Sequence, residues 1–206
     1  SIFVEVHNLK KYFLYCSKIS FMKKILALCL VALLLSCNSK EVQTVTIKNQ
    51  YSVQLPDFLS KAKDLHQDAS LQYQNALREF YVVVIDEPKK EFYAIAETTE
   101  DFPADFNGYH QILKNGLEEG IQDIQITPTK DTQINGLKAK TFSLTGEIGT
   151  IPVYYEVAYV EGKDKFYQIV TWTLKDNKEK YAEQMQNIIS SFKETGTARS
   201  NDRSKK

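Results

Sequence analysis

Asn135 and Gly136 stand between two segments in which apolar and polar residues alternate, and this pair constrains the fold more than any other feature of the sequence. Both residues readily adopt positive φ angles, so Asn-Gly favours the type I′ turn that joins neighbouring antiparallel strands. We therefore predict a hairpin made of residues 124–134 and 137–144. Such a hairpin belongs to an antiparallel sheet.

Alternating or continuous apolar segments predict further strands on both sides of this hairpin. The apolar run at residues 80–85 ends at Asp86-Glu87-Pro88, as expected of a central strand closed by a turn. Residues 92–96 are predicted to return beside it as its hairpin partner. A turn at Gly162 separates the last two strands. The other predicted strands are residues 51–55, 69–75, 153–160 and 166–174.

Two segments have the three-to-four-residue period of an amphipathic helix. Gly116 and Gly120 lie near the apolar stripe of the first, which indicates either close packing on the sheet or a helix end near Gly120. In the second, Asp176 and Glu179 have the spacing of a capping box. We therefore predict the α+β class, with an antiparallel β-sheet of about six or more strands flanked by helices. The apolar stripe of the first helix consists of Phe106, Tyr109, Ile112, Leu113, Leu117 and Ile121. That of the second consists of Tyr181, Met185, Ile188, Ile189 and Phe192.

A targeting signal precedes these elements. Met22 is followed by two lysines, by the apolar run at residues 25–35 and by Ser36-Cys37. This is the order of charged, hydrophobic and small-residue regions in a signal peptide, which we place at residues 22–36. The apolar run is shorter than the roughly 20 residues that a transmembrane helix needs.

Leu34-Leu35-Ser36-Cys37 resembles the lipobox of bacterial lipoproteins, although Leu35 replaces the smaller or β-branched residue that is commonest there. The resemblance implies signal cleavage between Ser36 and Cys37, lipidation of the Cys37 thiol and acylation of the new amino terminus. One acyl chain binds a bilayer only marginally, so several chains make a stable anchor. The alternative is an uncleaved apolar helix in which Cys29 and Cys37 are ordinary small residues.

The remaining terminal segments also have an expected role. Residues 1–21 precede Met22 without clear periodicity, so we expect a wrongly extended reading frame; the alternative is a long positive flank of the signal peptide. Residues 37–43 are the expected anchor and tether, and the polar residues 193–206 a disordered tail. All three cysteines lie at or before Cys37, which excludes disulfides and thiol catalysis in the domain that follows.

The order of strands, helix, antiparallel meander and C-terminal helix resembles the PsbP-like fold across residues 44–192. The resemblance implies an α/β/α sandwich. Relatives include an extrinsic photosystem II subunit and envelope lipoproteins, and they share no catalytic residues that could be carried over. The motifs that carry it are Tyr51-Ser52-Val53-Gln54-Leu55-Pro56, Ile134-Asn135-Gly136-Leu137, and Phe166-Tyr167-Gln168-Ile169 with Ser191-Phe192.

Charge and motif content argue against several functions. The 26 basic and 26 acidic residues give zero formal net charge, which argues against nucleic-acid binding. After Cys37 the only histidines are His66 and His110, and the sequence gives neither a partner, so we predict no metal, no cofactor and no catalytic residue. The acidic residues Glu97, Glu100, Asp101 and Asp105 lack the spacing of a calcium loop and are favoured before a helix by its dipole.

Aromatic residues on two adjacent predicted strands are the remaining candidate binding surface. If they are exposed, their large contact area suits a protein or a ligand. The alternative is that they form core beneath the helices. Alternation along the first of these strands places Tyr155 and Tyr159 on one face and Tyr154 on the other. Along the second strand, Trp172 shares a face with Phe166 and Val170. The set is Tyr154, Tyr155, Tyr159, Tyr167 and Trp172.

These observations predict a membrane-anchored bacterial envelope lipoprotein that acts as a non-enzymatic protein-binding or accessory module. The alternative is a carrier or sensor of a small apolar ligand held in a groove between sheet and helices. An enzyme ranks third, because it would need His66 or His110 beside a carboxylate in a cleft. The expected partners are the membrane, through Cys37, and an envelope protein. Asn38 is not the aspartate that retains such proteins at the inner membrane, which favours the periplasmic face of the outer membrane.

Overall fold

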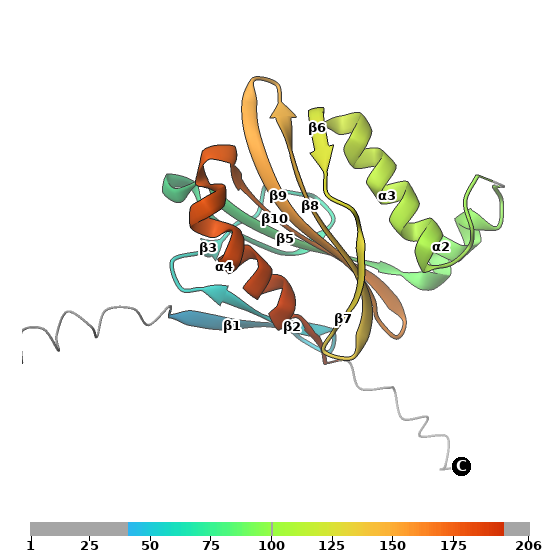
Figure 1. Cartoon of the computed structure of the whole chain (residues 1–206). Coiled ribbons are helices and arrows are strands. Elements are labelled where there is room, and N and C mark those ends of the chain that lie inside the picture. Colours follow the sequence, from blue (N-terminus) through green and yellow to red (C-terminus); the bar gives the residue numbers. More distant parts are fainter. Residues whose placement is uncertain (1–40, 100, 196–206) are drawn as a thin grey trace, which may run out of the picture. The chain divides into compact units, whose positions relative to one another are not determined.

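The computed structural model describes residues 41–99 and 101–195, and the elements in these ranges belong to one compact unit that begins at Val42 (Figure 1). An eight-stranded antiparallel sheet lies at its centre, in the order β3-β4-β5-β10-β9-β8-β6, and β7 also pairs with β8. This sheet and its flanking helices confirm the predicted fold class. The strands are β3 (Ser60–Lys61), β4 (Ala69–Asn75), β5 (Phe80–Pro88), β6 (Gln122–Ile126), β7 (Lys130–Ile134), β8 (Leu137–Ile148), β9 (Ile151–Glu161) and β10 (Lys165–Leu174).

Asn135 and Gly136 form the predicted hairpin turn, with φ angles of 48° and 84°. The turn joins β7 and β8 in the expected register, with Ile134 opposite Leu137. The segment before it, predicted as one strand over residues 124–134, is two strands, because Pro128 lacks the N–H that a continuous ladder needs. Both β6 and β7 pair with β8.

The C-terminal helix α4 (Lys178–Ser191) and a small second sheet cover one face of the central sheet. The small sheet consists of β1 (Val42–Ile47), β2 (Tyr51–Pro56) and β11 (Lys193–Glu194). Apolar side chains from both cover elements meet those of β4, β5, β9 and β10 in one cluster. Its fully buried members include Tyr51, Phe80, Ile169, Met185 and Phe192.

Helices α2 (Lys89–Ala96) and α3 (Phe106–Gly120) pack on the opposite face. Phe166 of β10 lies at the centre of this second core and contacts the rings of Phe92, Phe106 and Tyr109. The start of α3 agrees with the predicted stripe, and Asp105 caps it by accepting hydrogen bonds from the backbone N–H groups of Asn107 and Gly108. The unit is therefore the α/β/α sandwich that the sequence resemblance implies.

The prediction of a strand at residues 92–96 is wrong, because this segment belongs to α2. The two neighbours of β5 are β4 and β10, so β5 has no free edge for a hairpin partner. As a helix, the segment instead turns Phe92 and Tyr93 toward Phe166. The strand before it is also longer than predicted and continues to Pro88.

The ends of α4 differ from the prediction as well. Asn177 is the N-cap and makes no capping hydrogen bond through its side chain, so the capping box is wrong; the 3₁₀ turn η2 (Lys175–Asn177) leads into the helix instead. Lys193 and Glu194, predicted to be disordered, form β11. Glu194 accepts a hydrogen bond of 2.9 Å from the Tyr167 hydroxyl, which holds this short strand in place. A further 3₁₀ turn, η1 (Ala76–Arg78), connects β4 and β5.

Several predictions concern residues outside the described ranges. They are the extended reading frame at 1–21, the signal peptide at 22–36, lipidation at Cys37 and disorder at 196–206, and they stay predictions. Within residues 41–99 and 101–195, no helix has the length and apolar content needed to cross a bilayer.

Candidate functional site

Glu156 is a carboxylate in the middle of β9, on the sheet face that α4 covers. Its neighbours Tyr155 and Val157 belong to the opposite core, so strand alternation sends Glu156 toward α4. Ser143 of β8 and Thr171 of β10 are its cross-strand partners. A row of short polar side chains therefore crosses the centre of the sheet and leaves space beside the carboxylate.

A cleft of about 470 Å³ opens at this row, between β8, the connection from β6 to β7, and the C-terminal half of α4. Glu156 and Gln186 line it together with residues that are mostly polar or charged, among them Lys130, Ser143 and Ser190. This size falls within the range of small-ligand sites. The cleft is open to solvent, unlike the enclosed pocket that a carrier of an apolar ligand requires.

The two oxygens of Glu156 have different surroundings. Oε1 accepts hydrogen bonds from the Tyr154 hydroxyl and from Nε2 of Gln186, the latter at 2.8 Å. Oε2 accepts no hydrogen bond from residues 41–99 or 101–195. It keeps some exposure to solvent, so a group in the cleft can reach it. Burial, together with the adjacent carboxylate, raises the pKa of Tyr154 far above its usual value, which keeps its hydroxyl a donor.

Glu156 is only 7% exposed, yet no basic side chain of the described chain forms an ion pair with it. Lys130 lines the cleft, and Lys178 Nζ lies 5.2 Å from the centre of the Tyr154 ring. The C-terminal turn of α4, where Ser190 borders the cleft, adds partial negative charge from backbone carbonyls. The cleft therefore presents a buried anion that lacks a direct counter-charge.

A second cleft of about 280 Å³ lies on the other face, at the beginning of α3. Its charged groups neutralise one another: Lys140 pairs with Asp131 at 2.5 Å, and Lys138 Nζ lies 3.7 Å from Glu161. Asp105 is already engaged as the cap of α3. Each charged residue of this second cleft therefore has a partner, so the Glu156 cleft is the stronger candidate.

The predicted aromatic surface is wrong for most of its residues. Tyr154, Tyr159 and Tyr167 are each 2% exposed and pack in the cores beneath the helices, because strands β9 and β10 lie in the middle of the sheet. The predicted division between faces is correct, with Tyr155, Tyr159 and Trp172 on the α3 side and Tyr154 and Tyr167 on the α4 side.

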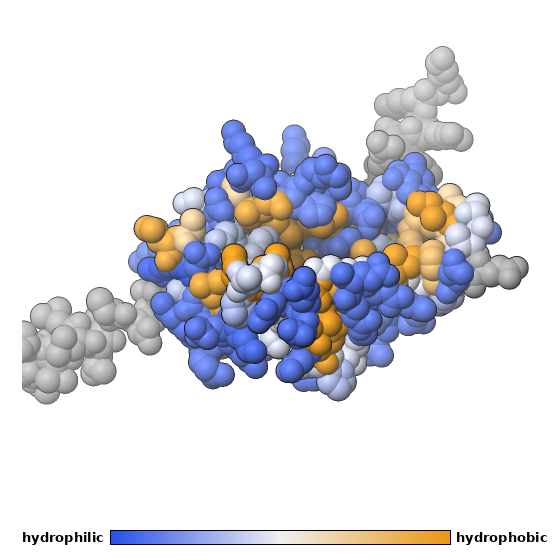
Figure 2. Space-filling view, turned by 90° about the horizontal axis from the view of Figure 1, so that it is seen from above, coloured by the Kyte–Doolittle hydropathy of each residue, from blue (hydrophilic) through white to orange (hydrophobic). Residues whose placement is uncertain are grey.

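Trp172 is the partly exposed member of the set. Its ring stacks between those of Tyr81 and Tyr155, at 5.1 and 5.8 Å between centroids. Figure 2 looks onto the end of the sheet at which β8 turns into β9, and shows hydrophobic residues in separate patches among hydrophilic ones.

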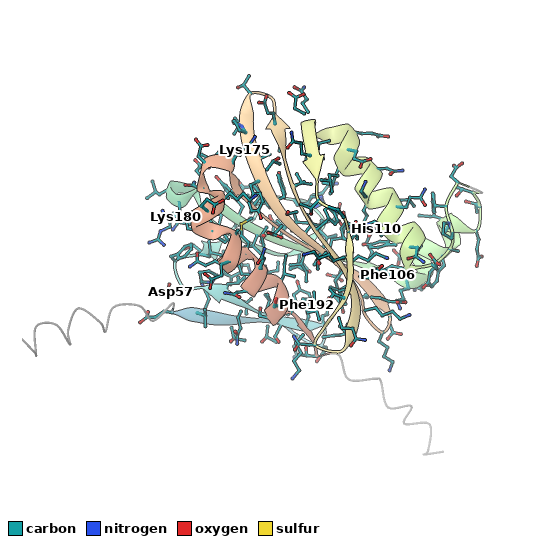
Figure 3. All side chains as sticks on the ribbon, viewed as in Figure 1. Asp57, Phe106, His110, Lys175, Lys180 and Phe192 are labelled. Carbon is teal, nitrogen blue, oxygen red and sulfur yellow. The ribbon has the colours of Figure 1, made fainter. Side chains whose placement is uncertain are left out.

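The two histidines of the domain lie in different places and do not combine. His66 is in the exposed loop before β4, where its Nδ1 accepts the Asp68 N–H. His110 of α3, labelled in Figure 3, packs against the rings of Phe142 and Tyr159 of the sheet. Burial lowers its pKa, and nearby lysines lower it further. Neither histidine has a carboxylate as a hydrogen-bond partner.

One of the acidic residues before α3 has a structural role. Asp105 acts as a helix cap, as the dipole argument predicts, and Glu100 lies outside the described residues. No group of three histidine, cysteine, aspartate or glutamate side chains converges within residues 41–99 and 101–195.

Glu156 and Gln186 were not singled out from the sequence. A signal for Glu156 exists, since it is the one charged residue within the apolar segment Val153 to Val160. A buried charge is costly and is retained where it has a partner or a role. Gln186 carries no comparable signal, because its position over Glu156 depends on how α4 crosses the sheet.

No family model matches the sequence, and no protein of known description matches it at the sequence level. Solved structures do match. The solution structure of the cyanobacterial PsbP protein CyanoP from Synechocystis sp. PCC 6803 aligns with a TM-score of 0.51 and 12% identity, over 77% of this chain and 95% of that one. The chain therefore has the PsbP-like fold.

Two further structures align less closely. LpqN, described as involved in cell envelope biogenesis of Mycobacterium tuberculosis, aligns with a TM-score of 0.49 and 9% identity, over 76% of this chain and 92% of LpqN. A protein of unknown function from Pseudomonas aeruginosa aligns with a TM-score of 0.42 and 9% identity, over 73% of this chain and 95% of its own.

Proposed function

We propose that this chain is a lipid-anchored, non-enzymatic accessory protein of the bacterial envelope, in which the PsbP-like domain binds a protein component of that envelope. The observation that carries the proposal is the distance in sequence between Cys37, the last residue of the lipobox-like motif, and Val42, where the folded unit begins. Residues 38–41 are the whole connection, which is shorter than the tether predicted at residues 37–43, because Val42 and Gln43 belong to β1.

A connection this short would hold the domain at the membrane. The five steps from Cys37 to Val42 reach at most about 18 Å when the chain is fully extended. An anchored domain would therefore remain next to the lipid headgroups, and the partner we propose is itself at the membrane. Asn38 after the modified cysteine supports the periplasmic face of the outer membrane as the location.

The described side chains support a binding role over a catalytic one. His66 and His110 lie apart, and His110 Nε2 contacts the Thr129 hydroxyl at 3.1 Å rather than a carboxylate. Glu156 is held by Tyr154 and Gln186, neither of which is an activated nucleophile. The arrangement can fix a ligand group in place.

Lipid attachment and partner binding can be tested in one experiment. Cells expressing the full chain, a Cys37→Ser variant or a Cys29→Ser variant are labelled with an alkyne fatty acid, crosslinked and separated into membrane and soluble fractions. Cys29 lies in the apolar run, so Cys29→Ser is the matched control.

We expect label, membrane association and one stoichiometric envelope protein with the wild type and Cys29→Ser, and loss of all three with Cys37→Ser. If Cys37→Ser is labelled as strongly as the wild type, the proposal that Cys37 carries the lipid anchor is overturned. Labelled wild-type chain that crosslinks to no specific protein would overturn the binding role.

A further inference from the structure

The Glu156 cleft has the features of a site for a positively charged group. We propose that it binds a primary alkylammonium group, carried either by a free amine or by a lysine side chain of a peptide. This inference concerns the cleft alone and does not depend on lipidation of Cys37.

The charge of the site selects a cation. Glu156 is more than nine-tenths buried and has no ion pair within the described ranges. Buried charges are normally paired, because an uncompensated one is destabilising. A ligand that brings a positive charge into the cleft would supply the missing partner, and the carbonyl end of α4 favours the same sign.

The hydrogen bonds at Glu156 select an ammonium over a guanidinium. Tyr154 and Gln186 already occupy Oε1, so only Oε2 is free. A guanidinium binds a carboxylate best through both oxygens at once, whereas an ammonium acts as a point charge with three donors. The hydroxyls of Ser143 and Thr141 line the same cleft and can accept the remaining ammonium protons.

The same geometry argues against a divalent metal. Calcium and magnesium sites combine several oxygen ligands, usually including more than one carboxylate. Glu156 is the only carboxylate among the residues that line the cleft. A single positive charge on a narrow aliphatic stem fits this environment better.

The test is an NMR titration of the full-length ¹⁵N-labelled chain in detergent. The probes are n-pentylamine and the peptide acetyl-Gly-Lys-Gly-amide, which represent the two sources of the ammonium group. The controls are the same peptide with norleucine, which lacks the charge, and with arginine. We expect saturable shifts at β8, β9 and the end of α4 with the ammonium probes, weaker binding of the arginine peptide and none of the norleucine peptide.

Three variants make the test specific. Glu156→Gln removes the charge but keeps an oxygen for Tyr154 and Gln186, and we expect its affinity to fall at least about tenfold. Glu119→Gln removes an exposed charge from α3, on the other face, and should bind like the wild type. Lys130→Glu removes a positive charge that lines the cleft and should bind more tightly.

The result that overturns the proposal is equal affinity of the wild type and Glu156→Gln, or shifts that are spread over surface carboxylates without saturation. If Glu156→Gln does not fold, Lys130→Glu decides, and unchanged affinity of that variant counts against the site. Binding of n-pentylamine without the lysine peptide would assign the cleft to free amines, and the reverse would assign it to a protein partner.

Discussion

Gly108 lies where the backbone of the preceding loop crosses the first turn of α3. A Cβ atom at this position would come within 1.8 Å of the carbonyl oxygen of Pro103, which is backbone and cannot rotate away. Gly116 belongs to the same helix, but a Cβ there would meet nothing within 4 Å. Close packing therefore explains why position 108 is a glycine, but it does not explain the glycine at position 116. Gly120 is the last residue of the helix.

The surroundings of Gly108 and Gly116 predict that substitution by alanine changes the stability of the protein in opposite directions. Gly108→Ala should lower the free energy of unfolding by about 1 to 3 kcal/mol, because the loop must shift to admit the methyl group. Gly116→Ala should raise it by about 0.4 to 1 kcal/mol, because alanine restricts the unfolded chain and favours the helix. Urea denaturation of both variants checks this, and equal effects would contradict it.

His110 predicts a pH dependence of stability. Burial is the main cause of its lowered pKa; Lys140 and Lys114 add to the effect and Asp131 opposes it. A base with a lower pKa in the folded state binds more protons when unfolded, so stability falls as the pH decreases through the unfolded value near 6.5. Carboxylates also titrate below this pH, so a variant is needed for comparison.

His110→Gln removes this titration. The wild type should lose more stability than His110→Gln between pH 7.5 and pH 5.5, as measured by the urea midpoint at each pH. Parallel losses in the two proteins would show that His110 does not contribute.

At the scale of elements, the β7–β8 hairpin is tied to the end of α4 by one side chain. Asn135 has a positive φ angle, as the turn requires, and its Nδ2 donates to the carbonyl of Phe192 at 2.7 Å and to that of Ser190 at 3.2 Å. The residue that sets the turn therefore also satisfies carbonyls at a helix end, which otherwise lack intrahelical partners.

Asn49 provides a matched control for this double role. It also has a positive φ angle, 60°, and its side chain makes no hydrogen bond with the described residues. Asn135→Ala should therefore destabilise the protein by about 0.5 to 1.5 kcal/mol more than Asn49→Ala, which is the contribution of the lost hydrogen bonds. Chemical denaturation of both variants measures the difference, and equal losses would mean that the tie contributes nothing.

At the scale of the whole domain, two cores share one sheet. Met185 of α4 is fully buried on one face, and Trp172, the single tryptophan of the chain, lies on the other. Because β9 and β10 contribute side chains to both cores, we expect the domain to unfold as one cooperative unit.

Met185→Ala tests this cooperativity across the sheet. The substitution should lower the free energy of unfolding by about 2 to 5 kcal/mol, because it leaves a cavity in a packed core. Trp172 fluorescence and far-UV circular dichroism should report the same lowered midpoint. A fluorescence transition that does not move would show that the two cores unfold independently.

Local pattern alone determined most of the elements. The alternation around Asn135-Gly136, the stripe that begins at Phe106 and the apolar face of α4 each reflect a period that only one kind of element satisfies. They fixed the fold class and the division of aromatic residues between faces. Residues 92–96 were misassigned because so short an apolar segment fits a strand or a helix equally well.

Tertiary structure decided what depends on distant neighbours. It places Tyr154, Tyr159 and Tyr167 in the cores, because burial follows from the position of a strand within the sheet and not from the strand's own sequence. It also places Gln186 over Glu156, residues on elements separated by 30 positions, and so creates the cleft. A local pattern encodes which side of an element is apolar, but only the packing of elements determines which polar groups meet.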